Sequence, residues 1–200
     1  MDREAIVGEV LPIAQAAHNN GGLVIAQVEK ITDAPASPHA VHVPGILIDA
    51  LVISEPDQHG QTFAESFNSS YVESGDKVAL APMPFSERKI IARRALSEIE
   101  RGSIVNLGIG MPEGVVAVAA EEDRLDEFTL TLESGPIGGM PAGGLSFGCS
   151  AHPEAIIDPS SQFDFYDGGG LDIAVLGSVT IDAEGSVNVS ALGDRFAGVG

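Results

Sequence analysis

The sequence is poor in cations. Lysine and arginine together number 10 of 200 residues, against 29 aspartates and glutamates, and the formal net charge is −19. Nucleic-acid binding relies on clustered cations that contact phosphates, and attraction to an anionic membrane surface relies on the same charges. The composition therefore argues against both kinds of partner. It is more consistent with a need for solubility, or with a salt-rich or crowded host.

Cysteine, metal-ligand clusters and long apolar runs are also scarce. The single cysteine, Cys149, excludes an internal disulfide and a site built from several thiolates, which weakly favours a reducing cytoplasm. Without a nearby base, Cys149 is better interpreted as a small buried residue than as a nucleophile. His39 and His42 could pair on a metal, but no third ligand is evident, so we expect no metal site. The sequence contains no run of about 18 apolar residues, so no membrane-spanning helix is predicted.

The patterning that is present predicts an α/β protein, with an open, mostly parallel sheet and flanking helices. In the first part of the chain, apolar spacing indicates a helix over residues 3–18 and strands over 23–31 and 41–53. Pro12 is expected to kink that helix or to end it early. Residues 54–85 are polar and weakly patterned.

The second part is more regular and is expected to begin near Pro82-Met83-Pro84. Ser86 should cap a helix that runs to about Arg101, with Ile91, Ala95 and Ile99 on one face. The later elements are predicted as a strand over 103–107, a helix over 112–122, strands over 128–132 and 172–181, and a hairpin strand over 186–192. The first strand–helix–strand unit of this series predicts a parallel pair with a right-handed crossover.

Glu133 is the most informative residue. The run Thr129-Leu130-Thr131-Leu132, which alternates β-branched threonine with apolar leucine, predicts a buried strand. Glu133 follows it, and the glycine-rich residues 134–139 come next. Open α/β sheets bind ligands at this end of their strands. A carboxylate there, with glycine amides close by, could attack an electrophilic carbonyl. On chemistry alone, a carboxylate that caps a neighbouring loop is an equal alternative.

Two further glycine-rich loops are candidate binding sites. Gly108-Ile109-Gly110 stands between a strand and a helix, where it could hold a phosphate or simply form a tight turn. It is not a dinucleotide-binding loop, because Glu113 occupies the third glycine position and would repel a pyrophosphate. Glu113 itself is better explained as an acidic residue favoured by the helix dipole. Gly169, within residues 167–172, allows either a close approach to a ligand or a sharp turn.

Together these motifs resemble those of the family I CoA-transferases. The run at residues 105–112 is similar to the start of the family's second, β-type domain, and Glu133-Ser134-Gly135 is similar to its catalytic glutamate motif. Residues 163–177 are similar to the single-chain members, which include acetate or propionate CoA-transferases and acyl-CoA:3-oxoacid transferases. The resemblance covers nearly the whole chain and is strongest over residues 86–200.

This resemblance implies a domain organisation and a mechanism. Residues 1–85 would be the C-terminal part of the first, α-type domain, and residues 86–200 the N-terminal part of the second. Glu133 would attack an acyl-CoA thioester, giving an acyl-glutamyl anhydride and then a glutamyl-CoA thioester. The CoA would pass to acetate, propionate or a 3-oxoacid. No cofactor would be needed, because coenzyme A enters as a substrate.

The resemblance also implies that the chain is a fragment. It would act in the cytoplasm as a homo-oligomer, or with polypeptide that supplies the rest of the transferase. The expected contacts with substrate or CoA are Gly108, Gly110, Gly169, Gly198 and Gly200. Two alternatives stay open: a remnant that binds CoA without covalent chemistry, and a thioester hydrolase of the same fold.

Overall fold

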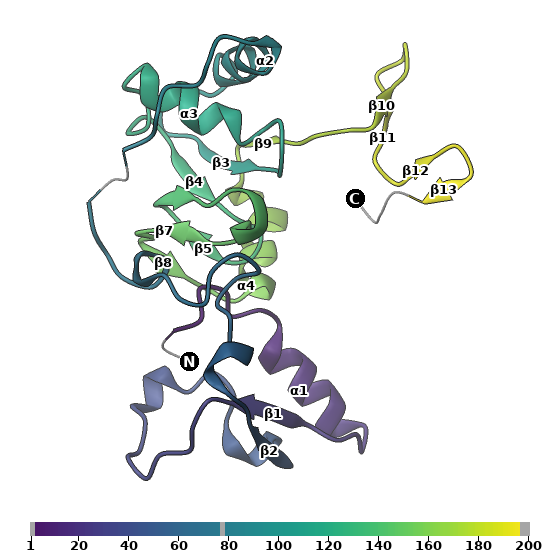
Figure 1. The fold of residues 1–200 in the computed structure, drawn as a ribbon. Helices are drawn as coiled ribbons and strands as arrows, with labels where there is room; N and C mark the ends of the chain where they lie inside the picture. Colours follow the sequence, from purple (N-terminus) through teal and green to yellow (C-terminus); the bar gives the residue numbers. More distant parts are fainter. Residues whose placement is uncertain (1–2, 77–78, 197–200) are drawn as a thin grey trace. The chain divides into compact units, whose positions relative to one another are not determined.

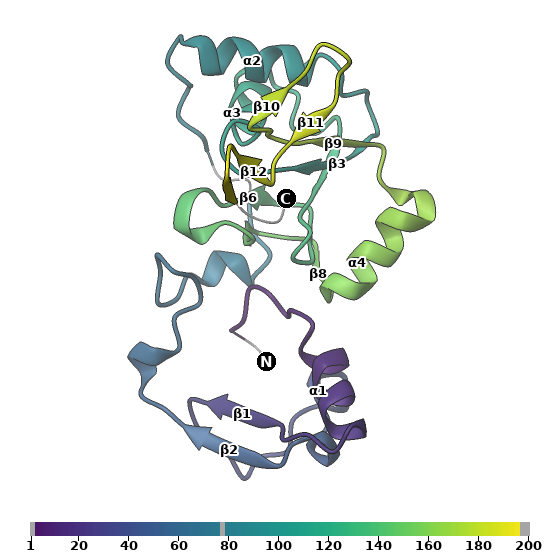
Figure 2. The same ribbon diagram turned by 90° about the vertical axis from the view of Figure 1, so that its right-hand side faces the viewer.

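The chain folds into two compact units. The computed structural model describes residues 3–76 and 79–196. The first unit combines the chain up to Ala79 with residues 130–170, and the second combines residues 80–129 with the chain from Leu171 onward (Figures 1 and 2). Each unit therefore brings together segments that are distant in sequence. How the units correspond to the family's domains stays a prediction, with the expected boundary at residue 85. Within the described residues, no helix is long and apolar enough to cross a membrane.

The N-terminal part of the first unit contains one α-helix and a two-stranded parallel sheet. These elements are α1 (Val10–Asn19), β1 (Ile25–Val28) and β2 (Ala50–Ile53). The strands pair in register from Ile25↔Ala50 to Val28↔Ile53 and lie side by side in both views (Figures 1 and 2). Only the end of the predicted strand over 41–53 is a strand, because the chain turns through a 3-10 helix at Gly45–Leu47 directly after Pro44.

Helix α1 begins later than its apolar spacing predicts. Gly8 has a φ of 65°, a conformation that cannot belong to a right-handed helix, and the helix starts at Val10. The expected effect of Pro12 was wrong. Pro12 is the third residue of α1, within the first turn, where a missing backbone N–H breaks no helical hydrogen bond.

The remainder of the first unit is built from short antiparallel strands and a short helix. These elements are β4 (Thr129–Thr131, whose first residue belongs to the second unit), β5 (Pro136–Ile137), β6 (Met140–Pro141), β7 (Ser150–Ala151), β8 (Ala155–Ile156) and α4 (Pro159–Phe165). Strand β5 pairs antiparallel with β4 on one side and with β8 on the other. Strands β6 and β7 form a separate hairpin. Strand β4 thus confirms the strand expected before Glu133.

The second unit holds two helices, a parallel pair of strands and two hairpins. Its elements are α2 (Glu87–Leu96), β3 (Ile104–Leu107), α3 (Gly114–Glu121), β9 (Ile173–Val175), β10 (Thr180–Ile181), β11 (Val187–Asn188), β12 (Ala191–Leu192) and β13 (Arg195–Phe196). Strand β3 pairs parallel with β9, and β10–β11 and β12–β13 are antiparallel. The amides of Gly102 and Thr129 donate to the carbonyls of Glu127 and Ser103, so the segments that lead into β3 and β4 run in the same direction.

Helix α2 confirms the predicted cap and corrects the predicted face. The Ser86 hydroxyl oxygen accepts a hydrogen bond from the Lys89 amide at 3.3 Å. Ile91 is 53% exposed, whereas Ala92 and Leu96 are buried, so within the helix the inward stripe is displaced by one residue; Ile99, beyond the helix end, is buried as expected. The helix also ends at Leu96, before the predicted Arg101.

The core of the second unit forms where α2 packs along α3. Its fully buried side chains include Leu96, Val105, Val115 and Val118. The helices approach closely at Gly114, where a Cβ atom would lie 3.1 Å from the Ala92 Cβ. A partly buried ion pair between Lys89 and Glu121 (2.5 Å) links the two helices.

The α/β class is confirmed, and the strand pairing is more mixed than the mostly parallel sheet that the sequence predicts. The β1–β2 and β3–β9 pairs are parallel, whereas β4–β5, β5–β8 and β6–β7 are antiparallel. Apolar patterning shows which residues are buried and does not specify the direction of the neighbouring strand.

Candidate active site

Glu133 lies in the tight turn that joins β4 to β5. The Gly135 amide donates to the carbonyl of Leu132 at 3.0 Å, and the Leu132 amide donates to the carbonyl of Pro136 at 2.9 Å. Residues 133–135 therefore form a three-residue hairpin loop, and Gly135 supplies the positive φ, 115°, that closes it. The carboxylate stands at the first position of this loop, directly after the strand.

The side chain of Glu133 is free of contacts with neighbouring polar groups. It is exposed, and its carboxylate forms no hydrogen bond or ion pair with any described residue. The alternative that Glu133 caps a neighbouring loop is therefore not what the described residues show. A carboxylate without an internal partner is available to a ligand or to a reacting carbonyl.

The glycines that follow Glu133 serve the packing of the chain. A Cβ atom on Gly135 would lie 1.9 Å from the Ile157 carbonyl oxygen, and one on Gly139 would lie 2.4 Å from that of Ala151. The Gly138 amide donates to the Leu130 carbonyl at 2.7 Å, and the Gly135 amide is bonded within the turn. The amides of Gly135 and Gly138, two of the glycines expected close to Glu133, therefore already have backbone acceptors.

Ser134 attaches the turn to the loop between β6 and β7. Its hydroxyl donates a hydrogen bond to the carbonyl of Gly148. The next residue, Cys149, is fully buried as predicted, and this burial raises the pKa of its thiol to about 11. The thiol is therefore neutral at physiological pH, which rules against Cys149 as a nucleophile.

Gly108 and Gly110 lie in the second unit, at the end of β3. The Gly108 amide donates to the Val175 carbonyl at 2.9 Å, and a Cβ atom there would lie 3.3 Å from Leu176 Cδ2. Gly110 has a φ of 85°, and its carbonyl accepts a hydrogen bond from Arg88. Arg88 also pairs with Glu113 at 3.6 Å. These contacts explain the glycines as parts of a tight turn, and their contact with a ligand stays a prediction.

The remaining predicted site residues lie elsewhere or outside the described chain. Gly169 has a φ of 94° in the wide turn after α4, in the same unit as Glu133. A Cβ atom there would meet nothing within 4 Å, so the turn conformation alone accounts for this glycine. Gly198 and Gly200 fall outside the described residues. Across residues 3–76 and 79–196, no three potential ligand side chains gather as a metal site.

A polar cluster in the first unit was missed by sequence reasoning. Glu65 Oε2 accepts hydrogen bonds from the hydroxyls of Tyr71 (2.6 Å) and Ser146 (2.8 Å), and Oε1 accepts one from Nδ2 of the Asn68 side chain (3.0 Å). These bonds, that from Tyr71 above all, hold the pKa of Glu65 below its usual value, while burial raises the pKa of Tyr71. Glu65 and Ser146 are 81 residues apart, and no local pattern links them.

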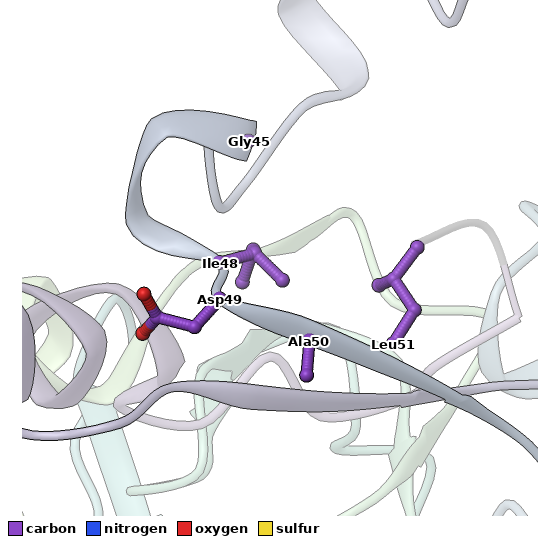
Figure 3. A pocket seen from close by; sticks show the side chains of 5 residues that line it. All are labelled: Gly45, Ile48, Asp49, Ala50 and Leu51. Atoms are coloured by element: carbon purple, nitrogen blue, oxygen red, sulfur yellow. The ribbon is translucent and has the colours of Figure 1, made fainter.

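A hollow beside β2 offers little chemistry. It is lined by Gly45, Ile48, Asp49, Ala50 and Leu51 (Figure 3). The lining is apolar apart from Asp49, whose carboxylate points away from Leu51 and accepts a hydrogen bond from the Val24 amide at 2.8 Å. The hollow therefore presents no reactive group.

Known proteins match the chain along nearly all of its length. No profile of a protein family matches it. It is 41% identical over 201 residues to the acetate CoA-transferase YdiF of Escherichia coli K12, a match that covers 98% of this chain and 38% of that enzyme. The crystal structure of the acyl-CoA transferase YdiF apoenzyme from E. coli O157:H7 has a TM-score of 0.85 at 39% identity, and covers 99% of this chain and 37% of that one. Over nearly all of its length this chain is homologous to a part of these CoA-transferases and shares their fold.

A further relative and a second structure of the E. coli O157:H7 transferase agree with this similarity. The caffeate CoA-transferase of Acetobacterium woodii is 40% identical over 208 residues, covering 100% of this chain and 40% of that enzyme. The E. coli O157:H7 transferase has also been solved as a thioester complex with CoA. That structure matches this chain with a TM-score of 0.85 at 38% identity, covering 100% of this chain and 39% of that one. The chain spans about two fifths of the length of the curated relatives that it matches.

Proposed function

We propose that this chain provides the nucleophilic glutamate of a CoA-transferase, and that Glu133 is that nucleophile. The observation that carries the proposal is an exposed carboxylate, free of partners among the described residues, in a turn whose backbone is held on both sides. Homology to a part of the CoA-transferases supports it. A relative solved as a thioester complex with CoA is consistent with covalent attachment.

The proposed reaction proceeds through two covalent intermediates. A Glu133 carboxylate oxygen attacks the carbonyl carbon of an acyl-CoA, and the C–S bond breaks as CoA leaves as a thiolate. The thiolate then attacks the glutamyl carbonyl of the resulting anhydride, and the acyl group leaves as a free carboxylate. An acceptor carboxylate attacks the glutamyl-CoA thioester and takes over the CoA by the reverse steps. Coenzyme A is thus a substrate, and no resident cofactor takes part.

A carboxylate is a weak nucleophile, so the rest of the site must lower the barrier. Oriented hydrogen-bond donors stabilise the developing oxyanion, and binding of the remote part of CoA contributes further. The amides of Gly135 and Gly138 already donate to backbone carbonyls, so the oxyanion donors must be other groups. We place Gly108, Gly110, Gly169, Gly198 and Gly200 in contact with substrate or CoA.

The proposed substrates are short acyl-CoA thioesters and acceptors such as acetate, propionate or a 3-oxoacid. Two relatives are named an acetate CoA-transferase and a caffeate CoA-transferase, and we attribute the choice of acceptor to the shape of the pocket that would bind it. One methylene in an apolar pocket changes discrimination by only about 1–3 kcal/mol. We further propose a cytoplasmic protein that works as a homo-oligomer or with polypeptide that supplies the rest of the transferase.

Trapping of the glutamyl intermediate tests the proposal. The purified chain is incubated with acetyl-CoA, alone and with the remaining transferase segments of a relative, then reduced with borohydride and mapped by mass spectrometry. We expect reduction at Glu133 that is absent from the Glu133→Ala variant. Absence of the modification in both mixtures would overturn the assignment. CoA release that does not depend on an added carboxylate would instead indicate a hydrolase.

A further inference from the structure

We propose that Glu65 is a positioning residue for Glu133, and that it acts through the loop between β6 and β7. The inference rests on the proposed role of Glu133 as the nucleophile. Three hydrogen-bonded steps within the first unit carry it: from Glu65 to Ser146, along the loop to Gly148, and from Gly148 to Ser134.

The first step fixes the far side of the loop. Ser146 is 5% exposed, and its hydroxyl donates to Glu65 Oε2 at 2.8 Å. The same oxygen accepts a hydrogen bond from the hydroxyl of Tyr71, and the Tyr71 side chain is 6% exposed. Hydrogen bonds to an ionised carboxylate are about twice as strong as neutral ones. Because no cation pairs with Glu65 among the described residues, its charge is directed onto these neutral donors.

The second step passes along a loop that has little freedom. The Phe147 amide donates to the Gly144 carbonyl at 3.2 Å, and the Cys149 amide donates to the Ser146 carbonyl at 3.3 Å. The Ala142 amide closes the base of the loop on the Cys149 carbonyl at 2.9 Å. A displacement of Ser146 is therefore transmitted to residues 147–149.

The third step reaches the turn that carries Glu133. The Gly148 carbonyl accepts the Ser134 hydroxyl, and a Cβ atom on Gly148 would lie 3.4 Å from Ser134 Oγ and 3.0 Å from Ile6 Cδ1. On its other side the turn packs against the Ile157 carbonyl through Gly135. The exposed carboxylate thus stands on a backbone held from two directions, and Glu65 supports one of them.

A double-substitution experiment tests this route. The variants Glu65→Ala, Ser134→Ala and the combination of both are compared for the rate of borohydride-trapped adduct in the full chain, in the mixture where the unsubstituted chain reacts. Each hydrogen bond contributes about 1 kcal/mol, so we expect each single variant to lower the maximal trapping rate about fivefold to tenfold. The acetyl-CoA concentration at half-maximal rate should change less than about twofold, because binding is untouched.

The combination decides between positioning and general destabilisation. If Glu65 acts through Ser134, the double variant should form the trapped adduct no more slowly than Ser134→Ala. If the two residues act independently, the fold-reductions in rate of the two single variants should multiply in the double variant. Ser134→Thr, which keeps a hydroxyl, should restore most of the rate. Glu55→Ala is the matched control, since Glu55 is an exposed carboxylate of the same unit without a described side-chain partner, and it should leave the rate unchanged.

Hydrogen exchange separates this inference from the proposed function. In Glu65→Ala and in the milder Glu65→Gln, amides of residues 132–135 and 142–149 should exchange faster while α1 keeps its protection. If the unsubstituted chain forms no adduct, the proposed function fails, but the exchange result still decides whether Glu65 restrains the turn. Rate effects that multiply in the double variant, or unchanged amide exchange at residues 132–135, would overturn the positioning role.

Discussion

Glu133 and Glu65 are carboxylates of the same unit with opposite surroundings. Glu133 is exposed and has no partner among the described residues, whereas Glu65 is held by two hydroxyls and an amide. A carboxylate that must form and break covalent bonds needs to be accessible and free of competing hydrogen bonds, as Glu133 is. A carboxylate that must stay ionised and keep a loop in place needs hydrogen-bond donors around it, as Glu65 has. The chemistry of each carboxylate therefore follows from its neighbours rather than from its residue type.

Removal of the Glu133 charge should abolish the reaction without affecting the fold. In Glu133→Gln we expect the trapped adduct to fall at least about a thousandfold, because the amide is a far poorer nucleophile. The free energy of unfolding should change by less than about 0.5 kcal/mol, since the side chain makes no described polar contact. Adduct mass spectrometry and denaturant unfolding measure the two effects. A variant that reacts at the original rate would remove Glu133 from the mechanism.

The buried thiol of Cys149 should be inert in the folded chain. With its pKa raised to about 11, roughly one thiol in a thousand is ionised at about pH 8. We expect iodoacetamide to modify native Cys149 at least about a hundredfold more slowly than the guanidinium-unfolded chain. Time-resolved mass spectrometry follows the modification. Equal rates in the two states would show that the thiol is accessible.

At the scale of elements, the β4–β5 hairpin depends on its glycine. Gly135→Ala adds a Cβ atom 1.9 Å from the Ile157 carbonyl oxygen at a φ of 115°, so the variant suffers both collision and backbone strain. We expect a loss of at least about 3 kcal/mol in the free energy of unfolding and no adduct. Gly144→Ala is the matched control, because its φ is also positive (60°) but the space around it is open. Gly144→Ala should lower the free energy of unfolding by only about 1 kcal/mol. A urea titration measures the effect of both variants.

The elements that could be predicted are those set by local chemistry. The cap at Ser86 and the apolar strand before Glu133 each depend on neighbouring residues, and both were confirmed. The start of α1 was not predicted, because residues 3–7 keep apolar spacing without being helical, and Gly8 takes a positive φ directly before the helix. The Glu65 cluster was beyond prediction for a different reason, since its partners meet only when segments 81 residues apart are folded together.

At the scale of the whole molecule, the two units cut across the order of the sequence. Residues 130–170, which carry Glu133, belong with the first 79 residues, whereas β3 and α3 belong with the chain after Leu171. The candidate nucleophile and the Gly108 and Gly110 turn are therefore built in different units. Because the chain spans about two fifths of the length of its curated relatives, an assay of the proposed function is run both with the chain alone and with the remaining segments of a relative.

Acid should destabilise both units, because every resolved carboxyl shift among the described residues has the same sign. The pKa lies below its ordinary value for Glu65, Asp158, Glu121, Glu127 and Asp182. The main causes are hydrogen bonds to the ionised form, from Tyr71 for Glu65 and from Lys89 for Glu121. Each of these groups binds its proton more readily in the unfolded chain, so stability rises with pH across the titration.

The stability that these carboxyls contribute is fully present above their ordinary pKa values, 3.8 for aspartate and 4.5 for glutamate. It is lost as the pH falls through their lower pKa values in the folded chain. We expect the Tm to be nearly constant from about pH 8 to about pH 6 and to fall steeply below about pH 4.5, as measured by circular dichroism. Glu65→Gln removes one of these titrations and should make the fall of the Tm in acid less steep. A Tm that is highest near the isoelectric point, pH 4.3, would mean that relief of charge repulsion outweighs the lost hydrogen bonds.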